Sequence, residues 1–537
     1  MELLVQLLEA HNNKTWYAYF KEHPHAYGAD AFEKAWTKFD QQCHKDFEGL
    51  IVEGAVNYTS LPEVSPYTQR PLGIKYPFYA LEGAQLLQNA QNSTENWRNI
   101  GVKKRTTLLI EAVSSFRPHL HELAYALQHT TGKSFGMAFQ AVTHAFDYAL
   151  EQIIIAYKAL LPYPKTVDWQ KPFGATPLKL TKTYVALPKG ISLVMADNFD
   201  PLRFALPALF ANLVCGNVVL LKPHDSVVLP IALVVKYLQQ YLQDQQISPQ
   251  IVQLSLVNEK NQTQFVREPA ISVIDYVGTP TFRASLKNLS NKEIFTHNSV
   301  INSAIVHSVY DLRLVMRNIA YTVSLYSGQG YGALQNIFIP ETGVQLEDGT
   351  METYDEVVAL LKNELLNIAL NPKTIGMLGA LQNAEIAGAM QTAKSSANRV
   401  LSELAKVRNK NYPAARQKAP LLLEALPSQK ALWSKKWLGG VVVVVKVKNS
   451  TEALDKIQTL AQENKSTTAM RCVLYHIEDK TTSIQYQKLS QCGLAIDHNF
   501  VGLNFPNQHF AFSDSLGQIG TNDYVKGRFS VIVNRSF

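Results

Sequence analysis

Short apolar runs that alternate with helical segments are the feature of this sequence that most restricts its fold. Runs of this kind are typical of parallel strands that are buried on both faces. The predicted strands are Ile191–Met195, Val218–Leu221, Ile251–Leu256 and Ile271–Tyr276, and the predicted helices between them include Leu202–Leu213 and Val228–Tyr241. This alternation predicts a doubly wound parallel sheet with right-handed crossovers.

The second half of the chain repeats the alternation. The predicted strands there are Ser303–Val306, Asn336–Pro340, Thr374–Leu378 and Gly440–Lys446, and the predicted helices are Leu312–Leu325, Tyr354–Leu370, Ile386–Leu404 and Ser450–Asn464. The chain has 537 residues, which is more than one hydrophobic core usually supports. We therefore expect two α/β domains in sequence.

The flanking regions have other patterns. The first 60 residues are rich in aromatic residues and helix formers, Leu61–Tyr79 is rich in Pro and Tyr and is expected to be an extended loop, and residues 80–160 have the spacing of three to four helices. Leu178–Val185 alternates like a strand, and Arg528–Val533 is a second strand-like run. We expect these last two segments to pair.

Charge and hydropathy exclude several classes of protein. The net charge of +7 is mild for this length, and the basic residues are scattered, so we expect no nucleic-acid partner. No apolar run approaches the about 18–20 residues of a membrane-spanning helix. The first ten residues, MELLVQLLEA, lack the basic start of a signal peptide. The sequence predicts a protein without a membrane partner.

The cysteines give no sign of a metal site. Cys43, Cys215, Cys472 and Cys492 lie far apart and form no CxxC pair. We expect reduced thiols in a cytoplasmic protein and no metal. Cys215 lies at a predicted helix-to-strand junction, where a buried small side chain is the ordinary role.

Several short segments, ordered along the whole chain, carry a family resemblance. They are Glu63–Tyr67 (EVSPY), His129–Gly132 (HTTG), Met137–Gln140 (MAFQ), Lys222–His224 (KPH), Leu325–Gln329 (LYSGQ), Gln335–Pro340 (QNIFIP) and Ala511–Asp514 (AFSD). With them the chain resembles the aldehyde dehydrogenase superfamily, and within it the phenylacetic acid degradation aldehyde dehydrogenases of the PaaN type.

The resemblance implies an α/β architecture with a dinucleotide-binding-type domain, a catalytic-type domain and a small bridging sheet used for oligomerisation. The implied parts are an N-terminal helical extension (1–60), the dinucleotide-binding-type domain (61–161 and 184–295), the catalytic-type domain (296–500) and the bridging segments (162–183 and 501–537). It also implies oxidation of an aldehyde with NAD or NADP. In the family a cysteine thiolate attacks the carbonyl, a glutamate activates water, and an asparagine amide helps to hold the oxyanion.

Three positions depart from the family pattern. The nucleophile position in Gly-Gln-x-Cys is Tyr331, and a phenol with a pKa of about 10 is a poor substitute for a thiolate. The position of the general-base glutamate is His297, and Lys436 stands where the family has a glutamate that binds the nicotinamide ribose. The resemblance therefore implies degenerate catalytic positions at His297 and Tyr331.

Other positions match the family. Asn198 matches the oxyanion asparagine, Lys222 the lysine that bonds the adenosine ribose, and Asp225 a ribose-binding carboxylate. Gly278 opens the helix that faces the pyrophosphate, but the family's second glycine is Arg283, which would either pair with a phosphate or fill the site. With Lys436 also changed, we expect weak or absent binding of NAD or NADP.

Structural roles compete with each of these assignments. His297 is a lone histidine at a strand end, Tyr331 can be a packing residue, and Asn198 can simply bridge its loop. The basic pair Lys435–Lys436 is usually a solvated face. Lys222 is the strongest functional candidate, because a residue directly after a buried strand lies at the carboxyl edge of the sheet, where ligands bind.

Three functional hypotheses follow. The first is a catalytically impaired or inactive aldehyde dehydrogenase homologue that keeps the fold. The second is an active NAD(P)-dependent oxidoreductase that acts on an aldehyde or oxo group. The third is a carbonyl reductase in which Tyr331 donates the proton and His297 tunes it. In each case we expect a small-molecule aldehyde or a CoA-linked ligand as partner, and a homodimer or higher homo-oligomer.

Overall fold

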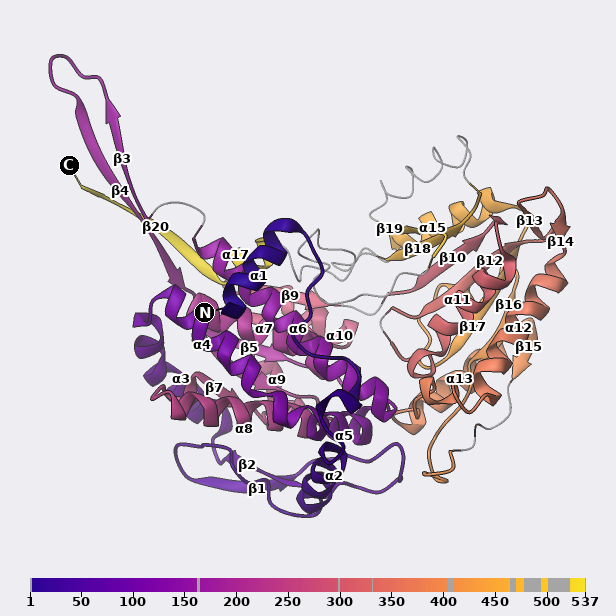
Figure 1. The fold of residues 1–537 in the computed structure, drawn as a ribbon, viewed down its shortest axis with the longest axis horizontal. Helices are drawn as coiled ribbons and strands as arrows, with labels where there is room; N and C mark the ends of the chain where they lie inside the picture. The colour runs from indigo at the N-terminus through magenta and orange to yellow at the C-terminus, as the bar shows by residue number, and fades with distance from the viewer. Residues whose placement is uncertain are drawn as a thin grey trace.

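The structure is a computed structural model with two α/β bodies, each built around one large sheet, and a narrow arm (Figure 1). It describes residues 2–161, 165–297, 300–330, 332–403, 407, 409–463, 470–477, 494–500 and 522–536. Within these ranges no helix combines the length and the apolar character that a membrane crossing requires.

The first body contains a five-stranded parallel sheet with the order β7-β6-β5-β8-β9. The strands are β5 (Ile191–Met195), β6 (Val218–Lys222), β7 (Val252–Leu254), β8 (Ile271–Val277) and β9 (Glu293–His297). Every residue of β5 and β6 is buried, as expected of strands covered on both faces. The order runs outward from β5 in both directions, so the predicted doubly wound parallel sheet is confirmed.

Helices connect these strands and cover the sheet. They are α7 (Pro201–Cys215), α8 (Leu229–Asp244), α9 (Glu259–Phe265) and α10 (Pro280–Leu286). Pro201 is well placed in the first turn of α7, where its missing N–H costs nothing. Gly216 ends the same helix with a φ of 90°, a left-handed conformation that suits glycine.

The chain before this sheet forms six α-helices in the described residues. They are α1 (Glu2–Asn13), α2 (Ala31–Gln42), α3 (Glu82–Asn99), α4 (Val102–Ser115), α5 (Leu120–Thr131) and α6 (Phe135–Leu160). Four of them fall in residues 80–160, as predicted. The long α6 is buried along most of its length and joins α4, α5, α7 and the sheet in one hydrophobic core.

The prediction of an extended loop over Leu61–Tyr79 is wrong at its end. Residues Lys75–Tyr79 form β2, which pairs antiparallel with β1 (Val56–Ser60). The physical reason is burial: Tyr76 is fully buried and Tyr79 almost so, and aromatic side chains favour a strand against a packed surface.

The second body contains a seven-stranded sheet with the order β15-β16-β17-β12-β10-β18-β19. The strands are β10 (Asn302–Val306), β12 (Leu334–Pro340), β15 (Arg399–Glu403), β16 (Leu421–Ala425), β17 (Val441–Val447), β18 (Arg471–Tyr475) and β19 (Ala495–His498). All neighbours are parallel except β15 and β16. The covering helices are α11 (Leu312–Ser324), α12 (Tyr354–Leu370), α13 (Ala384–Ser396), α14 (Lys430–Trp433) and α15 (Ser450–Glu463).

Two predictions in this body are wrong. The helix expected over Ile386–Leu404 ends at Ser396, and the chain continues as the antiparallel edge strand β15. The strand expected over Thr374–Leu378 is a 3₁₀ turn, Ile375–Met377. Both segments lie at the edge of the sheet or outside it, where partners distant in sequence decide the local conformation. A small separate sheet joins β11 (Ser308–Val309), β13 (Val344–Leu346) and β14 (Met351–Glu352).

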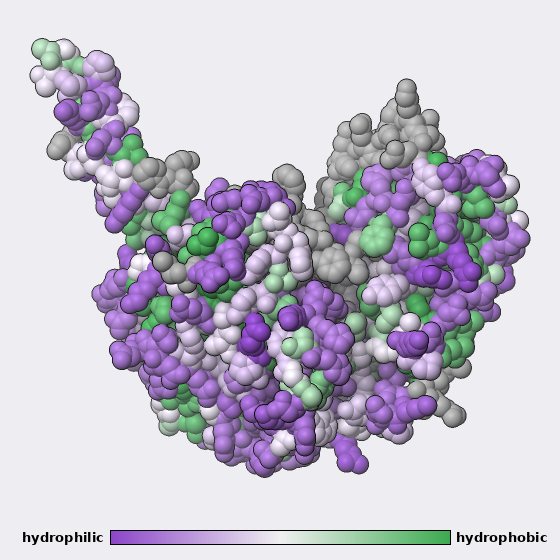
Figure 2. Space-filling view, viewed as in Figure 1, coloured by the Kyte–Doolittle hydropathy of each residue, from purple (hydrophilic) through white to green (hydrophobic). Residues whose placement is uncertain are grey.

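The third part is an antiparallel arm with the order β20-β4-β3. It consists of β3 (Thr166–Lys171), β4 (Leu178–Pro188) and β20 (Phe529–Ser536). Ile532 pairs with Val185, so the predicted pairing of these distant segments is confirmed. The arm projects from the first body as an isolated column, with hydrophobic and hydrophilic residues mixed along it (Figure 2).

Candidate functional site

Asn198 lies in the loop that follows β5 at the carboxyl edge of the first sheet. Its Nδ2 donates to Oε1 of Gln382 at 2.9 Å. In return, Nε2 of Gln382 donates to the Asn198 carbonyl and, at 3.2 Å, to the carbonyl of Thr130 at the end of α5. The amide that the sequence singles out is thus held by a side chain from the second body.

The same Gln382 reaches Gln329, the last residue of the SGQ segment. The backbone N–H of Gln382 donates to Oε1 of Gln329 at 3.0 Å. Nε2 of Gln329 donates to the carbonyls of Tyr326 and Ala380 at 2.8 and 3.1 Å. Arg416 fixes Gln382 from behind by donating to its carbonyl. A continuous amide network therefore joins the Asn198 loop to the SGQ segment.

The SGQ segment follows α11 in a strained turn. Tyr326 and Ser327 both have a φ of 55°, and Gly328 has a φ of 70°. Oγ of Ser327 donates to the Gly379 carbonyl at 2.8 Å. A Cβ on Gly328 would lie 2.6 Å from Cα of Gly440, so this position requires glycine for both its conformation and its close backbone contact. Such over-determined strain is typical of functional sites.

Lys133 is a fully buried lysine beneath the Asn198 loop. Its Nζ donates to the Phe199 carbonyl at 2.5 Å and lies 3.6 Å from Oδ1 of Asp200. It also lies 3.9 Å from the centroid of the Phe199 ring and 5.0 Å from that of Tyr326. Burial lowers the pKa of Lys133, and the charge of Asp200 offsets part of that effect. Lys133 thereby ties the Asn198 loop to the strained turn.

Lys222 is the last residue of β6, at the same carboxyl edge of the sheet. It is almost fully buried, and its Nζ lies 3.6 Å from Oδ1 of the partly exposed Asp225. Burial lowers the pKa of Lys222, which the charge of Asp225 partly offsets. Nδ1 of His224 lies 2.9 Å from Oγ of Ser226, which fixes the turn between β6 and α8. The structure thus brings together the two residues predicted to bind a ribose.

Gly278 follows β8, and the phenol of Tyr276 folds back over it. A Cβ on Gly278 would lie 2.7 Å from Cζ of Tyr276. The Tyr276 hydroxyl donates to the carbonyl of Thr279 at 3.3 Å, and Thr279 itself caps α10. Arg283 lies on this seven-residue helix, half-buried, and its Nε has no hydrogen-bond partner among the described residues. The tyrosine ring covers the backbone where the sequence predicts a pyrophosphate.

His297 ends β9 and is buried. Its ring stacks on Phe204 of α7, with 5.1 Å between centroids, and meets the ring of Tyr524 edge-on at 6.2 Å. Phe204 and Tyr524 belong to a small hydrophobic cluster between the sheet and helices α7 and α17 (Asn522–Lys526). The surroundings of His297 are those of a packed aromatic residue.

Lys436 lies in the loop between α14 and β17. One side chain, Gln335, holds the backbone on both sides of it: its Nε2 donates to the Lys435 carbonyl at 2.8 Å and its Oε1 accepts from the N–H of Trp437 at 2.9 Å. Lys436 is half-buried, and burial lowers the pKa of its ammonium to about 8. No carboxylate in the described part of the chain contributes to that pKa.

The described cysteines all belong to elements other than the SGQ turn. Cys43 caps α2, Cys215 ends α7 and Cys472 lies inside β18. Burial raises the pKa of the Cys43 thiol to about 11 and that of Cys215 to about 12. Tyr331 and Cys492, with Ala511–Asp514, lie outside the described residues. No group of three or more metal-ligating side chains occurs in the ranges that are described.

The segments that carry the sequence resemblance also have structural roles. Glu63 accepts hydrogen bonds from the N–H groups of Val228 and Leu229 at 2.6 and 2.9 Å, which caps the start of α8. Oγ of Ser65 lies 2.8 Å from Nδ1 of His129. The EVSPY and HTTG segments therefore pack against each other and hold α5 and α8 in place.

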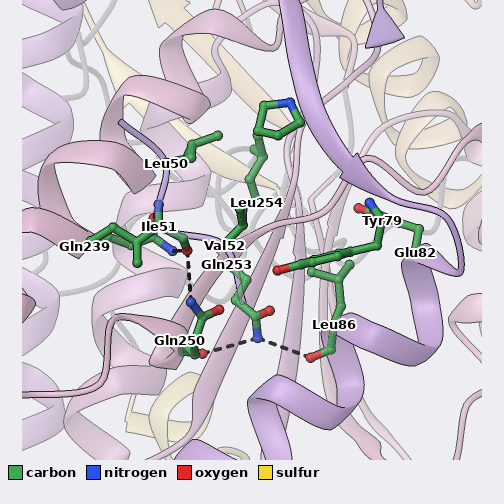
Figure 3. A pocket seen from close by; sticks show the side chains of 11 residues that line it. Leu50, Ile51, Val52, Tyr79, Glu82, Leu86, Gln239, Gln250, Gln253 and Leu254 are labelled. Carbon is green, nitrogen blue, oxygen red and sulfur yellow. Dashed lines mark hydrogen bonds between the residues drawn. The ribbon is translucent and has the colours of Figure 1, made fainter. Parts of the chain in front are cut away.

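One cavity is lined by none of the residues above and lies between the loop before β1 and the elements β2, α3, α8 and β7 (Figure 3). Its polar groups serve the chain itself: Gln239 and Gln250 both donate to the Ile51 carbonyl, at 3.2 and 2.9 Å, and Gln253 donates to the Leu86 carbonyl at 3.1 Å. These bonds anchor the loop before β1, so the cavity has a structural role.

Sequence reasoning missed two residues around the Asn198 loop, Gln382 and Lys133. Lys133 directly follows the HTTG segment, which was the one signal available for it. Gln382 lies 184 positions from Asn198, in a segment without a periodic pattern, and no sequence signal points to it. Its role appears only when the two bodies are placed together.

Comparisons with known proteins agree with this geometry. The sequence profile of the aldehyde dehydrogenase family matches residues 53–467. A curated relative, 1-pyrroline-5-carboxylate dehydrogenase 1 of Halalkalibacterium halodurans, is 28% identical over 149 residues, which are 26% of this chain and 25% of the relative. The match therefore spans a quarter of that relative's length.

Solved structures are similar over nearly the whole chain. An NAD-dependent aldehyde dehydrogenase from Burkholderia multivorans has a TM-score of 0.89 and 28% identity, covering 100% of this chain and 97% of that one. A 1-pyrroline-5-carboxylate dehydrogenase from Thermus with bound NAD has a TM-score of 0.73 and 17% identity, covering 94% and 96%. The chain belongs to the aldehyde dehydrogenase family.

Proposed function

We propose that this family member does not carry out thiol-dependent aldehyde oxidation, and that it is a homologue of the phenylacetate-degradation semialdehyde dehydrogenases with impaired catalysis. The observation that carries the proposal is the placement of the thiols. Cys43, Cys215 and Cys472 lie in helix ends or strands with raised pKa values, and the nucleophile position next to Gln329 is Tyr331 in the sequence. Without a thiolate at the carbonyl, the covalent step has no nucleophile.

A further feature supports impairment, although the Asn198 amide does not. That amide donates one of its two N–H groups to Gln382, and the other remains for an aldehyde oxygen. His297 stacks on Phe204 inside an aromatic cluster, and burial of that kind does not suit a group that must activate water.

The family fold implies a dinucleotide cofactor, and the residues fit only one end of it. Lys222 and Asp225 offer a buried ammonium and a carboxylate to an adenosine ribose. At the other end Tyr276 covers Gly278, and Lys436 offers a cation where a ribose hydroxyl needs an acceptor. Losing these contacts weakens affinity about 10- to 100-fold. The Burkholderia and Thermus neighbours, whose names mention NAD, support NAD or NADP as the class.

The test of the proposed function introduces the thiol and the carboxylate that the family mechanism uses. The double variant Tyr331→Cys with His297→Glu should produce NADH from an aldehyde such as phenylacetaldehyde, whereas the parent should not. The matched control is Tyr331→Ser with His297→Glu, which has the carboxylate but no thiol and should stay inactive. Absorbance of NADH measures all three proteins, and calorimetry with NAD and NADP measures cofactor affinity. Oxidation by the parent overturns the proposal.

The second candidate function is an active NAD(P)-dependent oxidoreductase. The 28% identity over the full chain to an NAD-dependent aldehyde dehydrogenase favours it. If the parent oxidises an aldehyde, replacing all four cysteines by serine separates two routes. Lost activity points to one of the cysteines, and retained activity points to reductase-type chemistry at Tyr331 and His297.

We also propose the wider assignments that the family membership supports. Residues 61–161 and 184–295 are the dinucleotide-binding-type domain, 296–500 the catalytic-type domain, and 162–183 with 501–537 the bridging segments.

Exposed apolar side chains on the arm support a homo-oligomer that covers them. These side chains are Val167, Trp169, Phe173, Val531 and Ile532. Light scattering at micromolar concentration tests this. We propose a cytoplasmic location and a small-molecule aldehyde or CoA-linked ligand.

A further inference from the structure

Gln382 connects the second body to the Asn198 loop of the first. It lies in the segment between the 3₁₀ turn Ile375–Met377 and α13, and its side chain is buried. Its amide contacts the side chain and backbone of Asn198 and the backbone of Thr130, which both belong to the first body. A residue that is distant in the sequence therefore sets the surroundings of the Asn198 amide.

The hydrogen bonds leave the Gln382 amide only one orientation. Its Nε2 faces two backbone carbonyl oxygens, that of Asn198 and, at 3.2 Å, that of Thr130. Carbonyl oxygens can only accept hydrogen bonds. If the amide were turned over, three oxygens would meet with no proton between them. The atom of Gln382 that faces the Asn198 side chain must therefore be the oxygen Oε1.

The orientation of the Asn198 amide follows from that of Gln382. Because Oε1 of Gln382 accepts, the Asn198 atom that lies 2.9 Å from it must be the nitrogen Nδ2. This nitrogen carries two N–H groups, and the described residues take up one of them. Asn198 is half-buried, so its second N–H group is open to a ligand. At this position the chain presents a donor, which suits a ligand oxygen that accepts.

The backbone of Gln382 is fixed on both sides. Oε1 of Gln329 accepts from its N–H at 3.0 Å, and Arg416 donates to its carbonyl. Arg416 also donates to the carbonyl of Leu381 at 3.1 Å. The Gln382 side chain thus starts from a held backbone and ends in a held amide. A donor that is oriented in advance costs a ligand less ordering on binding than a freely rotating one.

We propose that Gln382 is a positioning residue, which holds the Asn198 amide so that its second N–H group donates to the oxygen of a small carbonyl ligand. The ligand class rests on the proposed function, which names a small-molecule aldehyde. The inference goes beyond that function by naming the residue that decides whether Asn198 presents a donor or an acceptor. Binding of this kind makes and breaks no covalent bond, so it needs neither a thiol nor a dinucleotide.

The test measures carbonyl binding in the absence of NAD and NADP. The probe is 4-(dimethylamino)cinnamaldehyde, a coloured aldehyde. Its absorption moves to longer wavelength when its carbonyl oxygen accepts a hydrogen bond, because excitation moves electron density towards that oxygen. Titration of the probe with each protein gives both the shift and the dissociation constant.

Four variants separate the roles of the residues involved. Asn198→Ala removes the donor, and Gln382→Met removes the amide that positions it. Gln382→Glu keeps an oxygen opposite the Asn198 amide but lacks the N–H groups that bond the two carbonyls. Gln417→Met is the matched control, because the Gln417 amide is also buried and donates at 2.8 Å to the carbonyl of Leu378, four positions before Gln382.

The parent and Gln417→Met should bind the probe with the shift to longer wavelength, and Asn198→Ala should show no shift. Gln382→Met should lose the shift and weaken binding about 3- to 10-fold, which corresponds to about one hydrogen bond. Gln382→Glu should keep the shift, since an oxygen still orients the Asn198 amide. A merely structural role of Gln382 predicts that its two variants behave alike.

Four results overturn the inference. They are a parent without the shift, a shift that survives in Asn198→Ala, a shift that Gln382→Met and Gln382→Glu both keep or both lose, and a shift that Gln417→Met also loses. Since no dinucleotide is present, none of these results depends on the production of NADH. A parent that oxidises aldehydes would overturn the proposed function and would leave this inference standing.

Discussion

Lys133 and Lys436 both lie in regions that contact the strained SGQ turn. The two regions differ in the groups that surround the lysine ammonium. In the first, Phe199, Asp200 and Tyr326 surround the ammonium with an acceptor, a counter-charge and ring faces. In the second, the peptide backbone around the lysine is fixed, but its ammonium has no counter-charge among the residues that the structure describes. Burial alone therefore does not fix the charge state of a lysine; the groups around the ammonium also decide it.

The largest effect expected from this comparison is on stability. Lys133→Met leaves the Asp200 carboxylate and the Phe199 carbonyl without their partner, and breaking a buried ion pair costs about 3–5 kcal/mol. Lys436→Met removes no ion pair seen among the described residues, and at pH 10, where the folded Lys436 amine is mostly neutral, it should change the free energy of unfolding by less than about 1 kcal/mol. Urea unfolding of both variants against the parent measures the difference. Equal losses would show that the two lysines have the same role.

An intermediate effect is expected at the turn that both lysines flank. Gly328→Ala forces a φ of 70° on alanine and places its Cβ 2.6 Å from Cα of Gly440, which should destabilise the fold by about 1–3 kcal/mol. Gly332→Ala is the matched control, because a Cβ there meets nothing within 4 Å. Thermal unfolding compares the two. A Gly328→Ala variant as stable as the control would contradict the close contact between the turn and the loop.

The last expected effect is a pH dependence of the stability that Lys436 contributes. Its folded pKa of about 8 lies below the ordinary lysine value of 10.5, so between these values the unfolded state binds more protons and stability rises with pH. Below pH 8 the folded state bears the full cost of the buried charge, and above pH 10.5 that cost is absent. The parent should therefore gain stability relative to Lys436→Met from pH 7 to pH 10. A difference between parent and variant that stays constant over this range would place the pKa of Lys436 near its ordinary value.

The strands that the sequence predicted best are those buried on both faces, such as β5 and β6. A short continuous apolar run is typical of such a strand and fits few other structures. The prediction failed at β15, an edge strand whose conformation depends on its neighbour β16. A solvated face was one of the two interpretations of Lys436, the other being the ribose-binding position. In the structure Lys435 is exposed and Lys436 is half-buried.

The candidate site was predictable to the extent that its residues follow strands of one sheet. Asn198, Lys222 and Gly278 each follow a strand of the first sheet, and the structure places them along one edge, as the topology requires. The hydrogen bond between Asn198 and Gln382 was not predictable, because it depends on how two separately folded sheets meet. A local pattern carries no information about such a contact.

The arm joins strands that are synthesised at very different times. Phe529 pairs with Pro188, and at the root of the arm Arg528 donates to Asp275, a buried partner 253 positions earlier in the chain. During synthesis β4 and β3 therefore leave the ribosome long before β20, with one side of β4 lacking its partner strand. An unpaired strand edge is open to other chains. Until β20 has been synthesised, the nascent protein must avoid pairing between the open edge of β4 and strands of other copies.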